Sequence, residues 1–376
     1  MVRQNELSLR EKWRLFLSGV DVGPMVSPLC DDWSLDIPYY WPYDEPDPFP
    51  PGHKAHGLSQ QMAMAKICGW DPLYLASIDF IPKNQKILPI TKSYIKNNRK
   101  CIETHIETPY NELTSITEQN ENNHCIVKEW LTTEEDYKSM IWLAKQQMDY
   151  YEDIAIQQGH ELCKHIDDRG VLGTWNESPI ALNYNTNELF FHIADWPDLF
   201  AELHQLTVDL NLKKLKTLKK AGFDYLFYAV YGTEWSSPEF FKKWELEDTK
   251  KLFKEWQGMG GFIDWHTCGH IARFVEEGFY NQLKPEIFET LSEPPVGNIP
   301  SLRWARERID KEIITKGNIG LDILLNGTEE EIRTSVNRVR EETKGYKHIF
   351  GLSDDLLHNT PLANVKAFVD EASSRP

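Results

Sequence analysis

"GFIDWHTCGHIARFVEEG" (residues 261–278) joins a short apolar run to a polar turn and then to a helical segment. The same alternation recurs from about residue 134 onward, with strand-like runs such as "FDYLFYAVY", "ITKGNIG" and "YKHIFGLSD". Repeated βα units predict a parallel sheet with helices outside it. More than four such units without a Gly-x-Gly-x-x-Gly phosphate turn favour a closed barrel over an open nucleotide-binding sheet. We therefore predict an α/β fold, a (β/α)8 TIM barrel.

Two segments interrupt this pattern in the first third of the chain. Residues about 85–133 are rich in Thr, Ile, Asn and Glu and alternate in places, which predicts an inserted antiparallel hairpin. Residues 31–57 form a loop rich in proline and aromatic residues, and long loops in compact domains are usually functional or disordered. Its aromatic side chains favour either a pocket wall or a fastening to the surface. We expect a single barrel domain over residues 1–376, with an N-terminal extension and these two additions.

Composition excludes several classes of function. The chain has 376 residues, of which 41% are hydrophobic, and no apolar run approaches the roughly 18 residues that span a bilayer. A formal net charge of −17 argues against nucleic-acid partners, which require a basic surface. The N-terminus lacks the features of a signal peptide, and the six cysteines are irregularly spaced. We therefore expect a cytoplasmic protein without a disulfide framework.

Active-site residues of such barrels lie at the C-terminal ends of the strands. The polar residues at these places are Glu234, His266, Cys268, Glu289, Asn318, Ser353 and Asp354. In an extended strand, positions two apart point to the same face, so His266 and Cys268 could bind one ion. Zinc favours this combination of nitrogen and sulfur ligands. From spacing alone, a buried thiol beside a hydrogen-bonded histidine is the better interpretation, and the position at a strand end of the barrel makes the two interpretations equal.

Several motifs resemble the uroporphyrinogen decarboxylase superfamily. They are "HTCGHI" (266–271), "GNIGLDILLNGTEEEI" (317–332) and "GLSDDLLHNTPLANVKAFVDEA" (351–372), with "SPEFFKKW" (237–244) as a further match. The likeness is specific over about residues 222–372 and weaker in "LSLREKWRLFLSGVDVGPMV" (7–26). This resemblance implies the same barrel that the alternation predicts.

The superfamily contains two chemistries, which this sequence distinguishes in part. Decarboxylases of uroporphyrinogen carry an arginine-rich N-terminal segment that holds the substrate's carboxylates. The equivalent stretch here is "MVSPLCDDWS" (25–34), which has no arginine and contains Asp31 and Asp32. A pair of acidic residues would repel a polycarboxylate where a bidentate arginine should lie. A lyase of the decarboxylase type is therefore an alternative rather than the main prediction.

The other branch consists of cobamide-dependent methyltransferases, which resemble this chain in carrying His-x-Cys and bind zinc. That resemblance implies that His266 and Cys268 are zinc ligands, that Glu289 supplies a carboxylate, and that Asp354 stands where thiol-methylating relatives have a cysteine. An oxygen ligand in place of sulfur makes a harder site with greater affinity for oxygen substrates. We therefore predict a zinc-dependent methyltransferase that moves a methyl group from a methoxylated compound, such as an aryl methyl ether, to cobalt(I) of a separate corrinoid protein. A methylcobamide:thiol methyltransferase is the alternative within this branch.

The residues assigned to this reaction fall into three groups. Glu234 and Asp354 are predicted catalytic residues. The predicted zinc ligands are His266, Cys268, Glu289 and Asp354. The predicted substrate contacts are Asp31, Trp33, Tyr231 and His192. Helix capping, ion pairing or core packing are alternatives for several of them, including Glu234 as a helix cap. A metal-free isomerase or lyase and a corrinoid-binding scaffold are rival functions, and the sequence leaves the methyl donor, the direction of transfer and the oligomeric state open.

Overall fold

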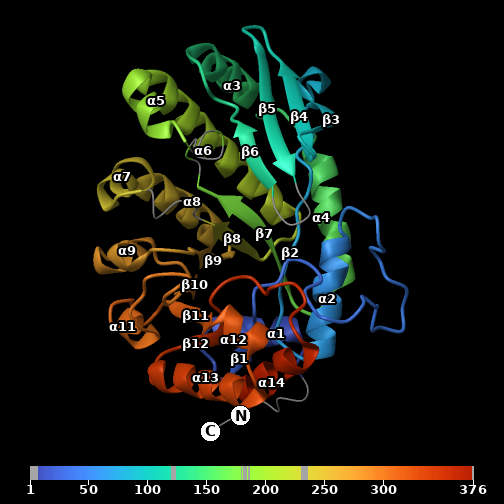
Figure 1. Ribbon diagram of the computed structural model, residues 1–376, viewed down its shortest axis with the longest axis vertical. Coiled ribbons are helices and arrows are strands. Elements are labelled where there is room, and N and C mark those ends of the chain that lie inside the picture. Colours follow the sequence, from blue (N-terminus) through green and yellow to red (C-terminus); the bar gives the residue numbers. More distant parts are fainter. Residues whose placement is uncertain are drawn as a thin grey trace. The chain divides into compact units, whose positions relative to one another are not determined.

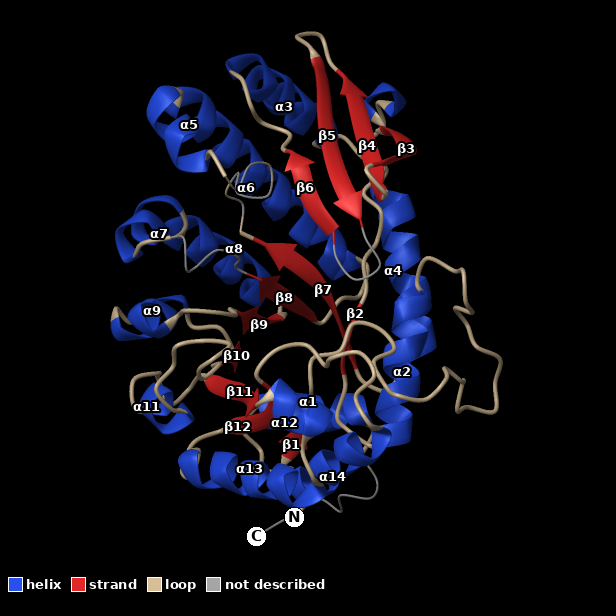
Figure 2. Cartoon of the chain, in the orientation of Figure 1, coloured by secondary structure: helices blue, strands red, loops and turns tan. Residues whose placement is uncertain are grey.

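The computed structural model describes residues 7–119, 124–178, 180, 184, 187–229 and 236–374 (Figures 1 and 2). The chain divides into two compact units. Unit 1 comprises Met1–Ile78, Gln158–Ser178 and Lys219–Pro376, and unit 2 comprises Asp79–Gln157 and Pro179–Leu218. The single domain over residues 1–376 therefore stays a prediction.

Unit 1 is built on eight parallel strands in the order β1-β12-β11-β10-β9-β8-β7-β2 (Figure 2). Their bounds are β1 Met25–Val26, β2 Leu73–Leu75, β7 Val171–Glu177, β8 Tyr225–Ala229, β9 Phe262–His266, β10 Ile287–Thr290, β11 Ile314–Ile319 and β12 His348–Leu352. From β7 onward each strand pairs with the next along the chain, as repeated βα units require. The predicted (β/α)8 barrel is confirmed.

Hydrogen bonds join the two edges of this sheet, between β1 and β2. The backbone amide of Asp71 donates to the carbonyl of Val26 at 2.7 Å, and the amide of Val26 donates to the Asp71 carboxylate at 3.0 Å. The Gln61 side chain donates to the carbonyls of Asp31 at 3.0 Å and Leu75 at 2.9 Å, and it accepts from the Leu75 amide at 2.8 Å. Strands β1 and β2 are the two ends of the sheet, and these hydrogen bonds of Asp71 and Gln61 close the barrel between them.

Helices follow the strands and cover the sheet (Figure 1). Those of unit 1 are α1 Leu9–Leu17, α2 His56–Cys68, α7 Pro238–Trp244, α8 Leu246–Gly258, α9 Ala272–Glu276, α10 Phe279–Leu283, α11 Leu302–Arg306, α12 Leu321–Asn326, α13 Glu329–Glu342 and α14 Leu362–Ser373. Helix α4 Glu152–Ile166 begins in unit 2 and ends in unit 1, and nearly all of α6 Pro197–Lys220 belongs to unit 2. Several begin at a side-chain cap; α13, for example, starts with a capping box between Thr328 and Glu331. Among the described residues, no helix is both long and apolar enough to cross a membrane.

Alternation along the strands sorts the barrel interior into layers. The lower layer is apolar and includes Phe262 on β9, Ile287 on β10, Ile314 on β11 and Ile349 on β12, with Trp13 and Phe16 of α1 in the same buried cluster. Two residues further along β9, β10 and β11 stand Asp264, Glu289 and Lys316, all at most 2% exposed. The sequence thus places a layer of charged side chains directly above the apolar layer of the barrel interior.

Unit 2 contains the predicted insertion. Its antiparallel sheet has the order β3-β4-β5-β6, with β3 Ile90–Lys96, β4 Arg99–Glu107, β5 Glu112–Gln119 and β6 His124–Lys128. The 3-10 helix η2 (Gln85–Ile87) precedes it, and helices α3 (Glu134–Gln147) and α5 (Leu189–Asp195) belong to the same unit. The insertion over residues 85–133 is therefore a four-stranded meander, larger than one hairpin.

The aromatic loop 31–57 runs along unit 1 from the end of β1 toward the start of β7. The guanidinium of Arg169, just before β7, lies over the Tyr43 ring at 4.8 Å and pairs with Glu45 at 2.6 Å. Phe49 contacts the His165 ring at the end of α4, with 4.9 Å between centroids. Since active sites of this fold lie at the opposite, C-terminal ends of the strands, residues 43–49 cannot line the site. For this part of the loop, the fastening interpretation holds.

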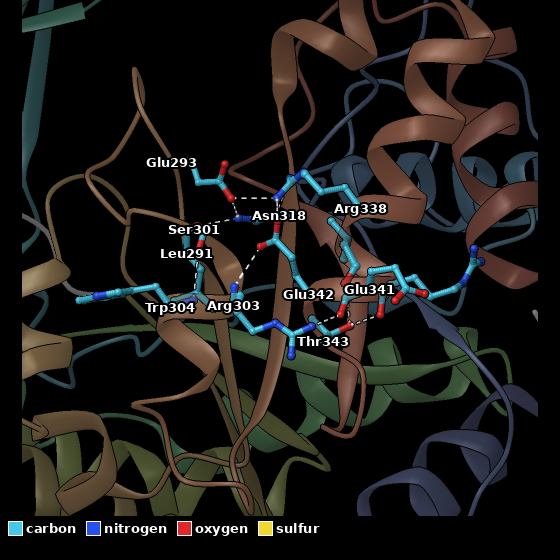
Figure 3. A network of polar contacts seen from close by, with 12 residues as sticks. Leu291, Glu293, Ser301, Arg303, Trp304, Asn318, Arg338, Glu341, Glu342 and Thr343 are labelled. Carbon is cyan, nitrogen blue, oxygen red and sulfur yellow. Dashed lines mark hydrogen bonds and ion pairs between the residues drawn. The ribbon is translucent and has the colours of Figure 1, made fainter.

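A polar network ties the loop after β10 to β11 and α13 (Figure 3). Arg338 donates to Glu293 at 2.9 Å, to Glu342 at 3.2 Å and to the side-chain oxygen of Asn318 at 3.2 Å. Asn318 in turn donates to the carbonyl of Leu291 at 3.0 Å. Asn318 is one of the polar residues at strand ends. Its side-chain amide therefore joins β11 to the loop after β10 and to α13.

We expect Arg338→Ala to lower the free energy of unfolding by about 1–2 kcal/mol, because three acceptors lose a shared, partly buried donor. Urea denaturation of the purified chain measures this change. Lys344→Ala is the matched control, since Lys344 is 76% exposed and stands 3.9 Å from Glu341. An exposed pair of this kind contributes roughly 0–0.5 kcal/mol. Equal effects of the two substitutions would contradict a structural role for the network.

Candidate metal centre

Three ligand-type side chains meet at the C-terminal end of the barrel in unit 1. His266 ends β9, Cys268 follows two residues later, and Asp354 follows β12. One potential ligand atom from each of them lies within 4.8 Å of the other two. His266 and Cys268 thus lie close together at the end of β9, and Asp354 brings a carboxylate to them from the end of β12.

The two ring nitrogens of His266 face different partners. Nδ1 lies 2.5 Å from Oε1 of Glu289, whereas Nε2 lies 3.8 Å from Oδ1 of Asp354. An ionised carboxylate only accepts hydrogen bonds, so Nδ1 carries the proton and donates to Glu289. Glu289, predicted as a ligand, stands on the side of the imidazole away from Asp354. From this side, Glu289 orients the imidazole ring through its contact with Nδ1.

The second carboxylate oxygen of Glu289 contacts another buried charge, the ammonium of Lys316. This oxygen, Oε2, forms an ion pair with Lys316, and Lys316 also donates to Oδ2 of Asp264 at 2.8 Å. All four side chains in this chain of contacts, from His266 to Asp264, are buried. The centre therefore rests on a continuous line of charged groups inside the barrel.

Burial and neighbouring charges shift the titration of these groups in the metal-free protein. Burial alone would lower the pKa of His266, but hydrogen bonds with Cys268 and Glu289 and the nearby carboxylates raise it to about 10. Burial would raise the pKa of Glu289, yet Lys316 and His266 lower it to about 2. Burial raises the pKa of Asp264 to about 6 against the opposing effect of Lys316. The site thus stabilises an ionised Glu289 next to a cationic imidazole.

The approach to the centre is acidic. Burial, followed by the charge of Asp32, raises the pKa of Asp31 to about 6. Burial and then the charge of Asp31 raise the pKa of Asp355 to about 7. Oδ1 of Asp31 is buried and makes no hydrogen bond within the described structure. These carboxyls, together with Asp354, make the site unfavourable for a polyanionic ligand.

Aromatic side chains flank the histidine on the side of β8 and β7. The Phe227 ring lies 5.1 Å from the imidazole of His266, and the Trp175 ring lies 4.5 Å from Phe227. Trp175 is half-buried. The wall beside the centre thus comes from strand residues, which the sequence analysis did not single out.

The structure brings together only some of the predicted site residues. Glu234 and Tyr231 lie outside the described residues. His192 is buried in unit 2, where it contacts the hydroxyl of Tyr137 at 3.4 Å. Trp33 follows Asp31 in unit 1, and its indole N–H donates to the carbonyl of Ile37 at 2.6 Å. The predicted catalytic role of Glu234 and the predicted substrate contacts of Tyr231, His192 and Trp33 stay predictions.

Lys316 and Asp264 were not among the residues predicted from the sequence. Both are charged residues inside apolar strand sequences, "IITKGNIG" and "GFIDWH". Asp264 stands two positions before His266 and therefore shares its face of β9. A buried charge requires a partner, so this pattern could have indicated an ion pair next to the histidine.

Comparison with known proteins bears on the fold and the family. No curated protein sequence matches the chain significantly. Among solved structures, a methyltransferase from Methanosarcina mazei is 13% identical, covers 98% of both chains and has a TM-score of 0.63. A B12-independent methionine synthase from Shewanella sp. W3-18-1 is 11% identical over 93% of this chain and 96% of that one, with a TM-score of 0.48. At these identities, the first similarity shows the fold alone.

The family model for uroporphyrinogen decarboxylase (URO-D) matches residues 183–375, which carry strands β8 to β12 and all three ligand-type residues of the centre. That match spans more than half of the chain. The chain therefore belongs to the uroporphyrinogen decarboxylase (URO-D) family.

Proposed function

We propose that this protein is a zinc-dependent methyltransferase, which moves a methyl group from a methoxylated compound to the cobalt(I) of a separate corrinoid protein. The observation that carries the proposal is the meeting of His266, Cys268 and Asp354 at the end of the barrel where catalytic residues of this fold lie. The structural similarity to a methyltransferase from Methanosarcina mazei agrees with this activity.

The three residues fit zinc in number and kind. A catalytic zinc site uses three protein ligands and keeps a fourth position for water or substrate. Neighbouring ligand atoms of a tetrahedral zinc lie about 3.5 Å apart, given bonds of about 2.0–2.3 Å. His266 Nε2 and Asp354 Oδ1 lie 3.8 Å apart, and the whole group spans 4.8 Å. Small side-chain movements would bring all three to that spacing.

Each residue has a task in the proposed reaction. Zinc bound here would supply a Lewis acid that stabilises the oxygen leaving from the ether. Asp354, as a ligand, gives the site an oxygen atom where a cysteine would favour thiols. Asp31 is the proposed proton donor to this oxygen, because burial raises the pKa of its carboxyl to about 6 and a fraction of it therefore stays protonated at neutral pH. Glu234 keeps its predicted catalytic role, in which it supplies or positions a proton.

The surroundings of the centre favour an uncharged, ring-containing donor. Phe227 and Trp175 offer ring surfaces next to His266, as an aryl ether requires. The carboxyls of Asp31, Asp354 and Asp355 oppose the binding of uroporphyrinogen, which carries many carboxylates. These charges are the reason to prefer methyl transfer over the decarboxylation after which the family is named.

We expect methyl transfer to depend fully on zinc. The zinc-loaded protein is mixed with a cobalt(I) corrinoid protein and a panel of methoxylated aromatics, and formation of methylcobalt is followed by absorbance. Treatment with a strong chelator should lower the rate at least about 100-fold, because the leaving oxygen loses its Lewis acid. Zinc added back should restore it. An undiminished rate in chelator, or methyl transfer only to a thiol, would contradict the proposal.

A further inference from the structure

The barrel interior below the metal centre buries a line of four charged side chains. His266, Glu289, Lys316 and Asp264 are 4%, 1%, 2% and 0% exposed, respectively. His266 contacts Glu289 at 2.5 Å, Lys316 pairs with the other oxygen of Glu289, and Lys316 contacts Asp264 at 2.8 Å. The line runs from the ligand set into the barrel.

Strand register fixes the order of these contacts. Glu289 on β10 lies directly opposite His266 on β9 and directly opposite Lys316 on β11. On the far side of Lys316, β12 presents Gly351, where a Cβ atom would lie only 3.2 Å from Cγ of the lysine. Glycine at this place gives the lysine stem room. The Glu289 carboxylate is thus held between an imidazole and an ammonium group by three adjacent strands.

Stability alone does not explain this arrangement. Burying ionised groups costs several kcal/mol each, and well-packed apolar side chains are often at least as stable as a buried ion pair. The arrangement has a further consequence for His266. Because the ammonium of Lys316 engages Oε2 of Glu289, Oε1 is directed at Nδ1 of the imidazole. Nε2 then points at Asp354.

We propose that Lys316 is a positioning residue for the metal centre: it fixes the Glu289 carboxylate against Nδ1 of His266, so that Nε2 is presented to zinc. This inference rests on the proposed function, because it requires that His266 binds the metal. Lys316 touches neither zinc nor substrate and acts through Glu289. Outer partners of ligating histidines typically contribute 10–100-fold to metal affinity.

Zinc affinity of the metal-free protein tests the proposal without any assay of methyl transfer. Removing Lys316 alone would leave two buried carboxylates, so the variant that isolates its role is Asp264→Asn/Lys316→Met, which removes one charge of each sign. Asp264→Asn is the reference protein. The dissociation constant for zinc is measured by competition with a chromophoric chelator, and near-ultraviolet circular dichroism checks that the chains are folded. We expect the double variant to bind zinc about 10–100-fold more weakly than the reference.

Glu289→Gln then distinguishes positioning through Glu289 from a general effect on the barrel. In the wild type, this substitution should weaken zinc binding at least about tenfold. In the Asp264→Asn/Lys316→Met background, the same substitution should weaken zinc binding less than about threefold, because residues that act as one unit have non-additive effects. The visible absorption of the cobalt(II)-loaded proteins should change in the same variants, because it reports the geometry of the ligands.

Each outcome decides between the inference and the function on which it rests. A weakened double variant with a non-additive Glu289→Gln supports positioning by Lys316. If the double variant binds zinc as tightly as Asp264→Asn, or if the two losses are fully additive, Lys316 does not act through Glu289 and the inference falls while the zinc site stands. If the wild type itself fails to bind zinc, the proposed function is overturned and the inference with it.

Discussion

Replacing Cys268 by alanine is expected to remove bound zinc and to abolish methyl transfer. Cys268 is the sulfur-bearing member of a group of three ligand-type residues, and its alanine variant leaves only His266 and Asp354. Two ligands cannot hold zinc against the affinity of ordinary buffers and chelators. Elemental mass spectrometry of protein purified without chelator should find about one zinc per chain in the wild type and almost none in the variant.

Cys125→Ala provides the matched control, because Cys125 is an exposed free thiol on β6 in unit 2. It should keep wild-type zinc and activity. Asp354→Cys is a second comparison, since it preserves three ligands while exchanging oxygen for sulfur, and it should retain the metal. Full zinc content and full activity in Cys268→Ala would make Cys268 a core thiol and would remove the basis of the proposed chemistry.

The sequence was sufficient to predict the barrel, and it pointed to the three ligand-type residues that meet at its end, whose binding of zinc stays a prediction. The alternation of apolar strands with helical segments depends on local pattern, and so does the common face of His266 and Cys268. Closure between β1 and β2 was not predictable, because it depends on Asp71 and Gln61, whose bonds join segments far apart in the chain. Such contacts leave no periodic signal.

The role of Glu289 shows where sequence reasoning ends. Glu289 was predicted as a zinc ligand, but the ring nitrogen of His266 that it faces depends on side-chain rotamers and on Lys316. Likewise, the aromatic loop gave no indication that residues 43–49 turn toward Arg169 at the start of β7. Composition predicts that such side chains are anchored, and only the fold decides where.

Asp31→Asn is expected to stabilise the zinc-free protein above about pH 6 by about 2–3 kcal/mol. Burial, and then the charges of Asp32 and Glu289, raise the pKa of Asp31 from 3.8 to about 6 on folding. A carboxyl whose pKa is raised by folding favours the folded state when it is protonated. That contribution is fully present below about pH 4 and is lost as the pH rises through about 6. Asparagine has no charge to bury. The gain in free energy of unfolding of Asp31→Asn over the wild type therefore develops over the same range of pH.

Urea denaturation at several pH values from 4 to 8, in the presence of a chelator, measures this dependence. The difference in free energy of unfolding between Asp31→Asn and the wild type should be close to zero near pH 4 and should reach its full size above pH 6. Asp44→Asn, an exposed change in the same loop, should stay within about 0.5 kcal/mol of the wild type throughout. A difference that is independent of pH would mean that the ionised Asp31 carboxylate does not destabilise the folded state.

A stabilising Asp31→Asn substitution would also say something about function. A carboxyl that destabilises its own fold at neutral pH is expected where a reaction needs it, since active sites commonly sacrifice stability. Loss of methyl transfer in a more stable Asp31→Asn protein would therefore assign Asp31 to the reaction, as a proton donor or a substrate contact. Undiminished transfer in the same protein would leave its buried charge without a catalytic reason, and the proton for the leaving oxygen would then have to come from another group, such as Glu234.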